Sequence, residues 1–279
     1  MWLDPRSVYV IAKKEFADNA RNKWILALVS IFLVLVLAAS IMAGGGKMGE
    51  MSMTVSTLSS ISSMLIPVIA IMLGYATISG EAESGAISVV LASPVRRVEV
   101  LLGKYLGLGS VICFSVLVGY GISGILIGAT TGIAQWTGYL VFMLLSMLLG
   151  LLYLSLSICF SSVLKRRVTS LAAGVVVFFW GAIVGMVVIG LYMATGGSLA
   201  DFIAGDTSSI PDWVWFEMFL SPQDGSGVAA MLAFGETEFL GYDLDLPPWV
   251  NLGTLVLVQL LWTVIPLVLA CVWFERRDV

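Results

Sequence analysis

Residues 138–163 read GYLVFMLLSMLLGLLYLSLSICFSSV, and the basic run Lys165-Arg166-Arg167 follows almost at once. The apolar run contains no Asp, Glu, Lys or Arg. About 20 consecutive apolar residues are enough for a helix to cross the hydrocarbon core of a bilayer. The run therefore predicts a transmembrane helix, and the basic run indicates that this end of the helix faces the cytoplasm.

The composition of the whole chain agrees with this first stretch. Hydrophobic residues make up 59% of the 279 residues, charged residues only 11%, and the mean hydropathy is +1.02. A soluble enzyme of this length needs far more surface charge, and a disordered chain would be far less apolar. The alternating segments of a membrane β-barrel are absent from the sequence.

We therefore expect an all-α polytopic membrane protein, with one transmembrane domain over residues 1–279. Charge-free stretches long enough to cross a bilayer predict six spans. They lie at about Trp24–Ala43, Leu58–Ser79, Tyr105–Ala129, Gly138–Val163, Val168–Thr195 and Val250–Phe274.

The basic residues predict the orientation. Of the 14 Lys and Arg residues, only Lys47 falls between spans one and two, at the outer end. The other thirteen are at the opposite ends of the spans, at positions 6, 13, 14, 21, 23, 96, 97, 104, 165, 166, 167, 276 and 277. By the positive-inside rule, both termini are cytoplasmic and the protein is a multi-pass protein of the cell membrane.

The segment 196–249 is then extracellular. It carries nine acidic residues and no basic one. One interpretation is a vestibule that attracts cations; the other is a solvated surface of a protein that lives in high salt. Within the segment, Asp212–Leu220 is amphipathic and is expected to lie at the outer membrane interface.

The predicted spans contain no ionisable acid or base, whereas ion-coupled transporters and pumps usually carry such groups within the membrane. The chain also lacks histidine and a Walker-type phosphate-binding loop, and its three cysteines lie in apolar runs. We therefore expect no catalytic, cofactor or metal site and an energy source on another chain. One soft-metal alternative is a thioether cluster for Cu(I), formed by Met42, Met48, Met51 and Met53.

Glycines at four-residue spacing predict close helix contacts. The pairs are Gly103/Gly107, Gly124/Gly128 and Gly181/Gly185. Such spacing lets two helix backbones approach each other in a membrane. We expect these contacts to lie within the bundle of one chain, with a dimer face as the alternative.

Two cytoplasmic features stand out. In Pro5–Arg21 the apolar residues share one helix face, and Asp4 before Pro5 is a candidate N-cap, so we expect an interfacial helix. The loop Gly80–Lys104 is longer than a connection requires. It predicts a short helix, a turn and a second helix leading into the third span, with Ser93 as N-cap and Pro94 as first helical residue. Such a charged hairpin offers a docking surface for a cytoplasmic partner.

This loop carries a family resemblance. Its Glu83-Ser-Gly85, Leu91-Ala-Ser-Pro94, Arg97 and Gly103-Lys104 resemble the corresponding loop of ABC-2 type permeases, the six-span membrane subunits of ATP-binding-cassette transporters. Within that family, Pro67, Gly80–Lys104 and Ser221–Asp224 look most like the permease of the copper-processing exporter that serves nitrous-oxide reductase maturation.

The resemblance implies a permease subunit that catalyses no covalent step itself. It implies a separate cytoplasmic ATPase subunit, a second permease copy, most simply in a homodimer, and export as the direction of transport. The residues expected to couple to the ATPase are Glu81, Glu83, Gly85, Leu91, Pro94, Arg96, Arg97, Gly103 and Lys104.

Two other classes of function stay open at this point: a stand-alone membrane assembly or scaffold protein, and an ion-coupled secondary transporter. An ATPase that copurifies with the chain would separate them from an ATP-driven permease. The sequence does not specify the cargo, because the predicted spans carry no charge pattern that selects one.

Overall fold

The computed structural model describes residues 4–44, 51–92, 94–130, 136–198, 210–235, 238–239, 242–243 and 246–277. Within these ranges the chain is helical, apart from a hairpin in which the two-residue strands β1 (Glu238–Phe239) and β2 (Tyr242–Asp243) pair antiparallel. With that small exception, the expected all-α class is confirmed.

Five helices in the described part are long and apolar enough to cross a membrane. They are α2 (Lys23–Gly44), α3 (Met51–Gly74), α6 (Arg97–Thr130), α7 (Trp136–Val163) and α13 (Leu252–Arg276). The pair α8 (Arg167–Phe178) and α9 (Trp180–Ala194) meets the same criteria together, but is bent by 41° at the break between them. The described part therefore has five candidate spans, or six when this bent pair counts as one span, and the pair covers most of the predicted fifth span.

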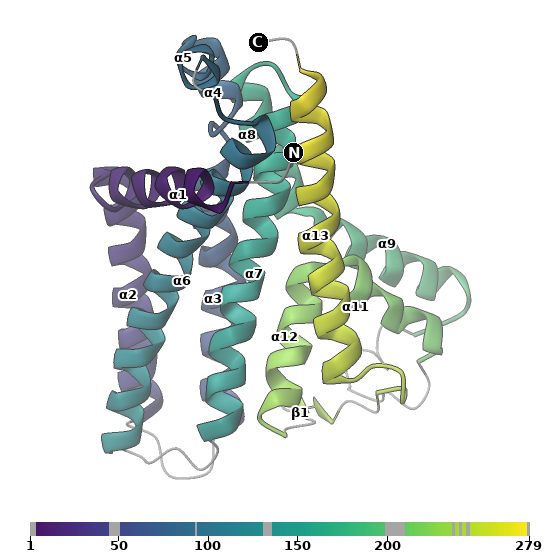
Figure 1. The fold of residues 1–279 in the computed structure, drawn as a ribbon. Coiled ribbons are helices and arrows are strands. Elements are labelled where there is room, and N and C mark those ends of the chain that lie inside the picture. The colour runs from purple at the N-terminus through teal and green to yellow at the C-terminus, as the bar shows by residue number, and fades with distance from the viewer. Residues whose placement is uncertain are drawn as a thin grey trace.

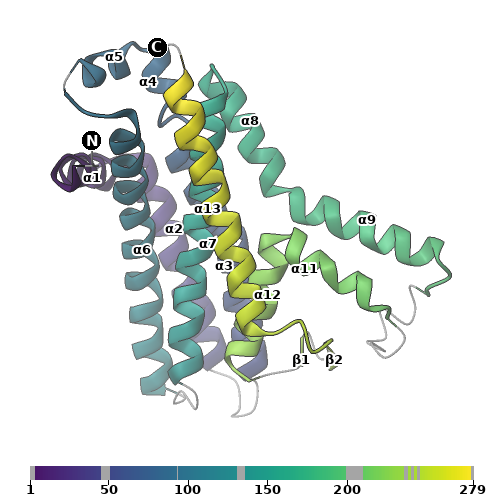
Figure 2. The same cartoon turned by 45° about the vertical axis from the view of Figure 1, so that its right-hand side comes forward.

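The bundle is organised around α7, which lies among α3, α6 and α13, whereas α9 leans away from the bundle (Figures 1 and 2). In the interior of this bundle, Tyr120 of α6 is fully buried. Its ring lies 5.7 Å from that of Phe32 in α2 and 4.9 Å from that of Phe142 in α7, and its hydroxyl pairs with Ser62 of α3. Four helices therefore meet at one aromatic side chain.

The N-terminal helix α1 (Pro5–Ala20) lies across the spans (Figure 1). The predicted cap is confirmed, because the Asp4 carboxylate accepts the backbone N–H of Arg6 and Pro5 is the first helical residue. Helix α1 crosses α6 at Gly103 and Gly107. A methyl group at Gly103 would lie 2.7 Å from Ile11 Cβ, so only glycine permits this close approach.

The other two glycine pairs also pack within the chain, as predicted. Gly124 and Gly128 of α6 face the rings of Tyr139 and Trp136 in α7, and Gly181 and Gly185 of α9 face side chains within the segment 217–224. All three pairs are used for contacts between helices of the same chain.

The loop before α6 contains two short helices, α4 (Ser79–Glu83) and α5 (Ala86–Leu91), joined at Gly85, whose φ of 73° suits glycine. The prediction that Pro94 starts the next helix is wrong, because α6 begins at Arg97; Ser93 lies outside the described residues. The Glu99 carboxylate accepts the N–H of Arg96 at 3.0 Å and so caps α6 from its third position.

The acidic segment 196–249 also contains helices in its described part. A 3-10 turn η2 (Asp212–Phe216), α11 (Glu217–Leu220) and α12 (Pro222–Ala233) follow one another. Helix α12 packs against α3, α7 and α13, and its Ala229 and Met231 are buried. Part of the segment predicted as an outer loop is therefore inserted among the spans.

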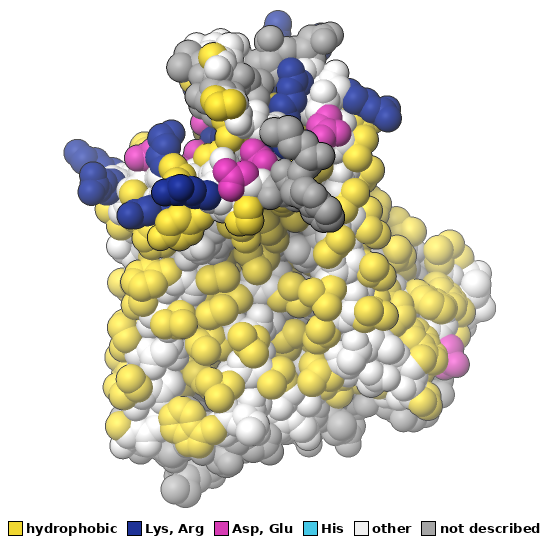
Figure 3. All heavy atoms as spheres, in the orientation of Figure 1, with side chains coloured by type: hydrophobic (Ala, Val, Ile, Leu, Met, Phe, Trp, Pro, Cys, Tyr) yellow, Lys and Arg dark blue, Asp and Glu magenta, His cyan; other side chains and the backbone are white. Residues whose placement is uncertain are grey.

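Figure 3 shows the distribution of charge on one face of the molecule. Lys and Arg side chains gather at one end, around α1 and the helix ends beside it, and a broad hydrophobic surface covers the spans. We call the end that carries both termini, α1, α4 and α5 the basic end.

Candidate functional site

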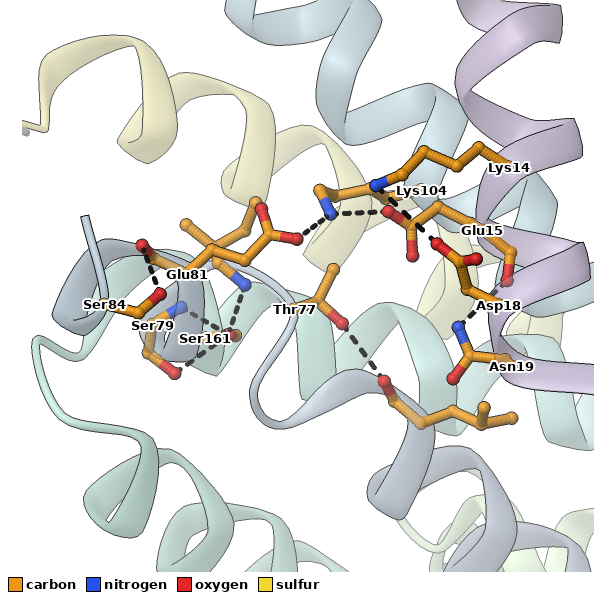
Figure 4. Close-up of polar contacts among 12 residues, drawn as sticks. Lys14, Glu15, Asp18, Asn19, Thr77, Ser79, Glu81, Ser84, Lys104 and Ser161 are labelled. Atoms are coloured by element: carbon orange, nitrogen blue, oxygen red, sulfur yellow. Dashed lines mark hydrogen bonds and ion pairs between the residues drawn. The ribbon is translucent and has the colours of Figure 1, made fainter. Parts of the chain in front are cut away.

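Lys104 joins three helices at the basic end. Its Nζ lies 2.7 Å from Glu15 Oε1 of α1 and 2.6 Å from Glu81 Oε1 of α4 (Figure 4). Lys104 is only 3% exposed, and lysine is rarely buried unless it is paired. The second oxygen of Glu81 is buried and has no hydrogen-bond partner among the described residues. The ammonium group therefore holds α1, α4 and α6 together.

Glu99, one turn before Lys104 on α6, makes a second link to the N-terminal helix. Its Oε1 accepts the backbone N–H of Asp4 at 2.8 Å, and the side chain is 3% exposed. The start of α1 is thus bonded to the start of α6 through one carboxylate. Hydrogen bonds with a charged partner are the stronger ones in proteins, so this contact fixes the entry of the chain.

Arg97 caps the C-terminal end of α13. Its guanidinium donates to the carbonyl oxygen of Phe274 at 3.0 Å and to that of Arg277, and it lies 5.8 Å from the centre of the Phe274 ring. The last carbonyls of a helix lack internal partners and carry partial negative charge. Arg97 supplies both the donors and the positive charge there.

Arg277 makes the equivalent contact with α7. It donates to the carbonyl oxygens of Ser161 at 2.8 Å and Ser162 at 3.1 Å. The Ser161 hydroxyl in turn accepts the N–H groups of Ile78 and Ser79, both at 3.0 Å, and so caps α4 (Figure 4). Arg277 therefore connects the end of α13 to the end of α7, and Ser161 connects the end of α7 to the start of α4.

Glu83 links α4 to α8. One of its oxygens accepts the N–H of Arg167 at 3.1 Å, and the other lies 3.6 Å from the guanidinium of the same residue. A carboxylate at the first residue of a helix is favoured by the helix dipole. Both residues are substantially exposed, so this pair is the weakest of the links.

The predicted coupling residues thus fall into two groups. The charged side chains Glu81, Glu83, Arg97 and Lys104 bond to other helices of the same chain, and Gly103 lies under α1. Gly85 and Pro94 are exposed, Arg96 is half-buried, and the side chain of Leu91 lies outside the described residues. The first group fixes the position of α4 and α5; the exposed group is open to a partner.

Sequence reasoning missed four members of this network: Glu15, Glu99, Ser161 and Arg277. It used Arg277 only to predict the orientation and Glu99 only as one of the charges near the turn of the predicted hairpin. It assigned no contact to Glu15 or Ser161. One signal was present, since Lys104 directly precedes a predicted span and a lysine at such a position needs a counter-ion. The partner itself could not be identified without the crossing of α1 over α6.

No group of three or more His, Cys, Asp or Glu suitable for a metal ion occurs in the described ranges. The proposed thioether cluster lies outside them, because the side chains of Met42, Met51 and Met53 and the whole of Met48 are not described. In the described part of the basic end, the charged and hydroxyl groups named above make contacts that link helices to one another. It is suited to transmitting movement between helices.

The comparisons with known proteins agree with this architecture. The model of a family described as ABC-2 family transporter protein matches residues 9–279. The chain is 31% identical over 283 residues to a probable ABC transporter permease protein NosY of Stutzerimonas stutzeri, covering 97% of this chain and 98% of that protein. It is also 31% identical over 289 residues to a protein of the same name from Pseudomonas aeruginosa, covering 98% and 99%.

The chain therefore belongs to the ABC-2 family of transporter proteins. The resemblance seen in the loop motif is confirmed over nearly the full length. Its relatives are permease subunits of ABC transporters, which are not catalytic themselves, and its apolar helices make it a multi-pass membrane protein.

Proposed function

We propose that this chain exports its cargo as half of a homodimeric pathway, and that a separate cytoplasmic ATPase subunit docks on α4, α5 and the start of α6. The basic end then faces the cytoplasm, in keeping with the positive-inside rule. The hydrophobic surface below it contacts lipid (Figure 3). The homodimer and the direction of transport are carried over from the family resemblance.

The observation that supports ATPase docking is the position of α5. Figures 1 and 2 show α5 at the outer edge of the basic end, beyond α1 and the start of α6, with α4 close to the end of α13. Ser84 and Ser88 are exposed there, whereas Ile87 is fully buried and anchors α5. A projecting element that is anchored on one side and bonded to neighbouring helices can pass a partner's movement on as a rigid body.

The contacts of Arg97 change how the docking should be tested. Reversing its charge would remove an ATPase contact, but it would also uncap α13. Exposed positions avoid this ambiguity. Ser84→Cys and Ser88→Cys, each in a cysteine-free background, can carry a maleimide photocrosslinker, with Thr137→Cys at the opposite end of α7 as the matched exposed control.

We expect both loop positions to crosslink to the ATPase encoded by a neighbouring gene, and the yield to change when ATP binds. Thr137→Cys should give no such product. Absence of crosslinks from Ser84→Cys and Ser88→Cys, in complexes that copurify and hydrolyse ATP, would place the ATPase elsewhere. Equal yields from the control position would show that the crosslinks are not specific.

A further inference from the structure

One edge of α1 combines basic and aromatic side chains. Arg6, Tyr9 and Lys13 follow one another at three- and four-residue spacing, so they lie side by side along the helix. All three are exposed, Tyr9 at 66%. The opposite side of the helix packs on α6 through Ile11. We call Arg6, Tyr9 and Lys13 the basic row; it points away from the bundle.

A contact with α6 indicates the depth of the basic row in the membrane. Phe16, three residues beyond Lys13, places its ring 6.4 Å from that of Phe114, edge to face. Phe114 is 60% exposed on a span, and Leu117 and Ile125 are exposed on the same side of α6. Figure 3 shows Lys and Arg side chains along α1 directly above such a hydrophobic surface. The row therefore lies where hydrocarbon meets headgroups, a level at which tyrosine is enriched.

The two bases of the row have no ion-pair partner among the described residues. Asp4 lies within electrostatic range of Arg6, but its carboxylate accepts the two hydrogen bonds of the N-terminal cap. Lys14, further round the helix, differs because its Nζ lies 3.7 Å from the carboxylate of Asp18. The positive charge of the basic row is therefore open to an anion from outside the chain.

The start of α2 adds to this surface. Arg21, Lys23 and Trp24 are exposed, Trp24 at 78%, and neither base is in an ion pair among the described residues. An indole at the end of a span is typical of the membrane interface. Bases and amphipathic rings thus alternate from the start of α1 to the start of α2.

A ligand that covers this surface must be anionic and apolar at once. A small water-soluble anion would neutralise the bases but leave the exposed rings and the apolar side of α6 uncovered. A zwitterionic lipid brings its own cation to the phosphate. An anionic phospholipid supplies an uncompensated phosphate at the level of the bases and acyl chains for the span below them. Charge and depth therefore favour the anionic lipid.

We propose that the basic row, together with Arg21 and Lys23, binds the headgroup of an anionic phospholipid, and that the bound lipid holds α1 against the spans. The basic side chains donate to phosphate oxygens, and an acyl chain lies along the exposed side of α6. This inference rests on the chain being a multi-pass membrane protein and does not depend on the docked ATPase.

The lipid contact is connected to the rest of the basic end. Glu15, on the side of α1 that faces α6, lies 2.7 Å from Lys104 Nζ, and the same Nζ lies 2.6 Å from Glu81 of α4. A lipid that positions α1 therefore also positions the carboxylate that Lys104 shares with α4.

Binding can be measured on the full-length chain alone, by native mass spectrometry from micelles that contain phosphatidylglycerol and phosphatidylcholine. We expect Arg6→Gln and Lys13→Gln each to lower the preference for phosphatidylglycerol about fivefold, the equivalent of the roughly 1 kcal/mol that one base contributes near an anionic surface. Lys14→Gln makes the same charge change on the same helix, and should keep the wild-type preference because Lys14 is already paired. Equal preference in all four proteins, or an equal loss in Lys14→Gln, would overturn the site.

Hydrogen exchange tests whether the lipid holds α1. Adding phosphatidylglycerol to phosphatidylcholine nanodiscs should slow exchange in α1 of the wild type and of Lys14→Gln, but not of the double variant Arg6→Gln/Lys13→Gln. In phosphatidylcholine alone the three proteins should exchange alike, since the replaced side chains are exposed.

Two outcomes would assign the row to another ligand. Inorganic phosphate that slows exchange in α1 as phosphatidylglycerol does would identify a free anion instead of a lipid. Loss of a copurifying ATPase from the double variant, with lipid preference unchanged, would identify a protein partner. Because the lipid measurements contain no ATPase, their failure leaves the ATPase docking proposal untouched.

Discussion

Replacing Gly107 by alanine should displace α1 from α6. The added methyl group would lie 2.5 Å from the carbonyl oxygen of Ala12 and 2.7 Å from Glu15 Cβ. A carbon and a carbonyl oxygen normally approach no closer than about 3.3 Å. Helix α1 must therefore move by roughly 0.8 Å, because the obstacle is backbone and cannot rotate away.

The size of the effect follows from two opposing terms. Overpacking of this kind costs about 1–3 kcal/mol, whereas Gly→Ala within a helix contributes about 1 kcal/mol of stability. Gly121, on the same helix, has no atom within 4 Å of its added methyl group. The helix term is common to both variants, so the difference between Gly107→Ala and Gly121→Ala isolates the packing cost.

Thermal unfolding in detergent measures this difference. We expect the midpoint of Gly107→Ala to lie several degrees below that of Gly121→Ala, at about 2–4 °C for each kcal/mol. Hydrogen exchange should be faster in α1 of the first variant only, since the shift also stretches the 2.7 Å contact between Lys104 and Glu15. Equal midpoints and equal exchange in the two variants would refute the close crossing of α1 over α6.

Three further predictions follow from the charges. Lys104→Met leaves Glu15 and Glu81 without their cation and should lower the free energy of unfolding by about 3 kcal/mol. Chemical unfolding measures this loss, and Lys104→Arg should retain much of the wild-type stability. The midpoint of thermal unfolding should rise with molar salt, which screens the acidic segment within about 3 Å; an unchanged midpoint would remove the high-salt interpretation. Because the carboxylate of Asp4 accepts the N–H of Arg6, its pKa lies below the usual 3.8. The cap is therefore kept above pH 4 and lost as the pH falls through that lowered pKa, and Asp4→Asn should abolish this dependence in the hydrogen exchange of α1.

The features predicted correctly from the sequence are those that local chemistry determines. A charge-free run is either long enough to span a bilayer or too short, so α2, α7 and α13 could be located within a few residues. The N-cap Asp4 with Pro5 is a local signal of the same kind. Glycine spacing predicted close contacts, although it could not identify α1 as the partner of Gly107.

The features missed are those that depend on depth and on distant contacts. The sequence predicted that α6 starts at Pro94, because the dipeptide Ser93-Pro94 suits a helix start. The helix begins at Arg97 instead, where the Glu99 carboxylate caps it. The position of Glu217 was missed because hydropathy finds segments that cross a membrane, not short ones that enter and return. A survey of ionisable groups limited to the predicted spans therefore did not include Glu217 and Asp224, which lie against Gly185 and Gly181 of α9.

Helix α7 runs from the basic end into the interior of the bundle (Figure 1). At the basic end its Ser161 caps α4, and the helix end accepts hydrogen bonds from Arg277. About two turns further along, the side chain of Tyr153 is buried in the bundle. Helix α7 is also packed against α3, α6 and α13, and close-packed protein interiors transmit strain. A displacement of α4 by the proposed partner would therefore act on α7 through Ser161 and, through α7, on the helices packed against it.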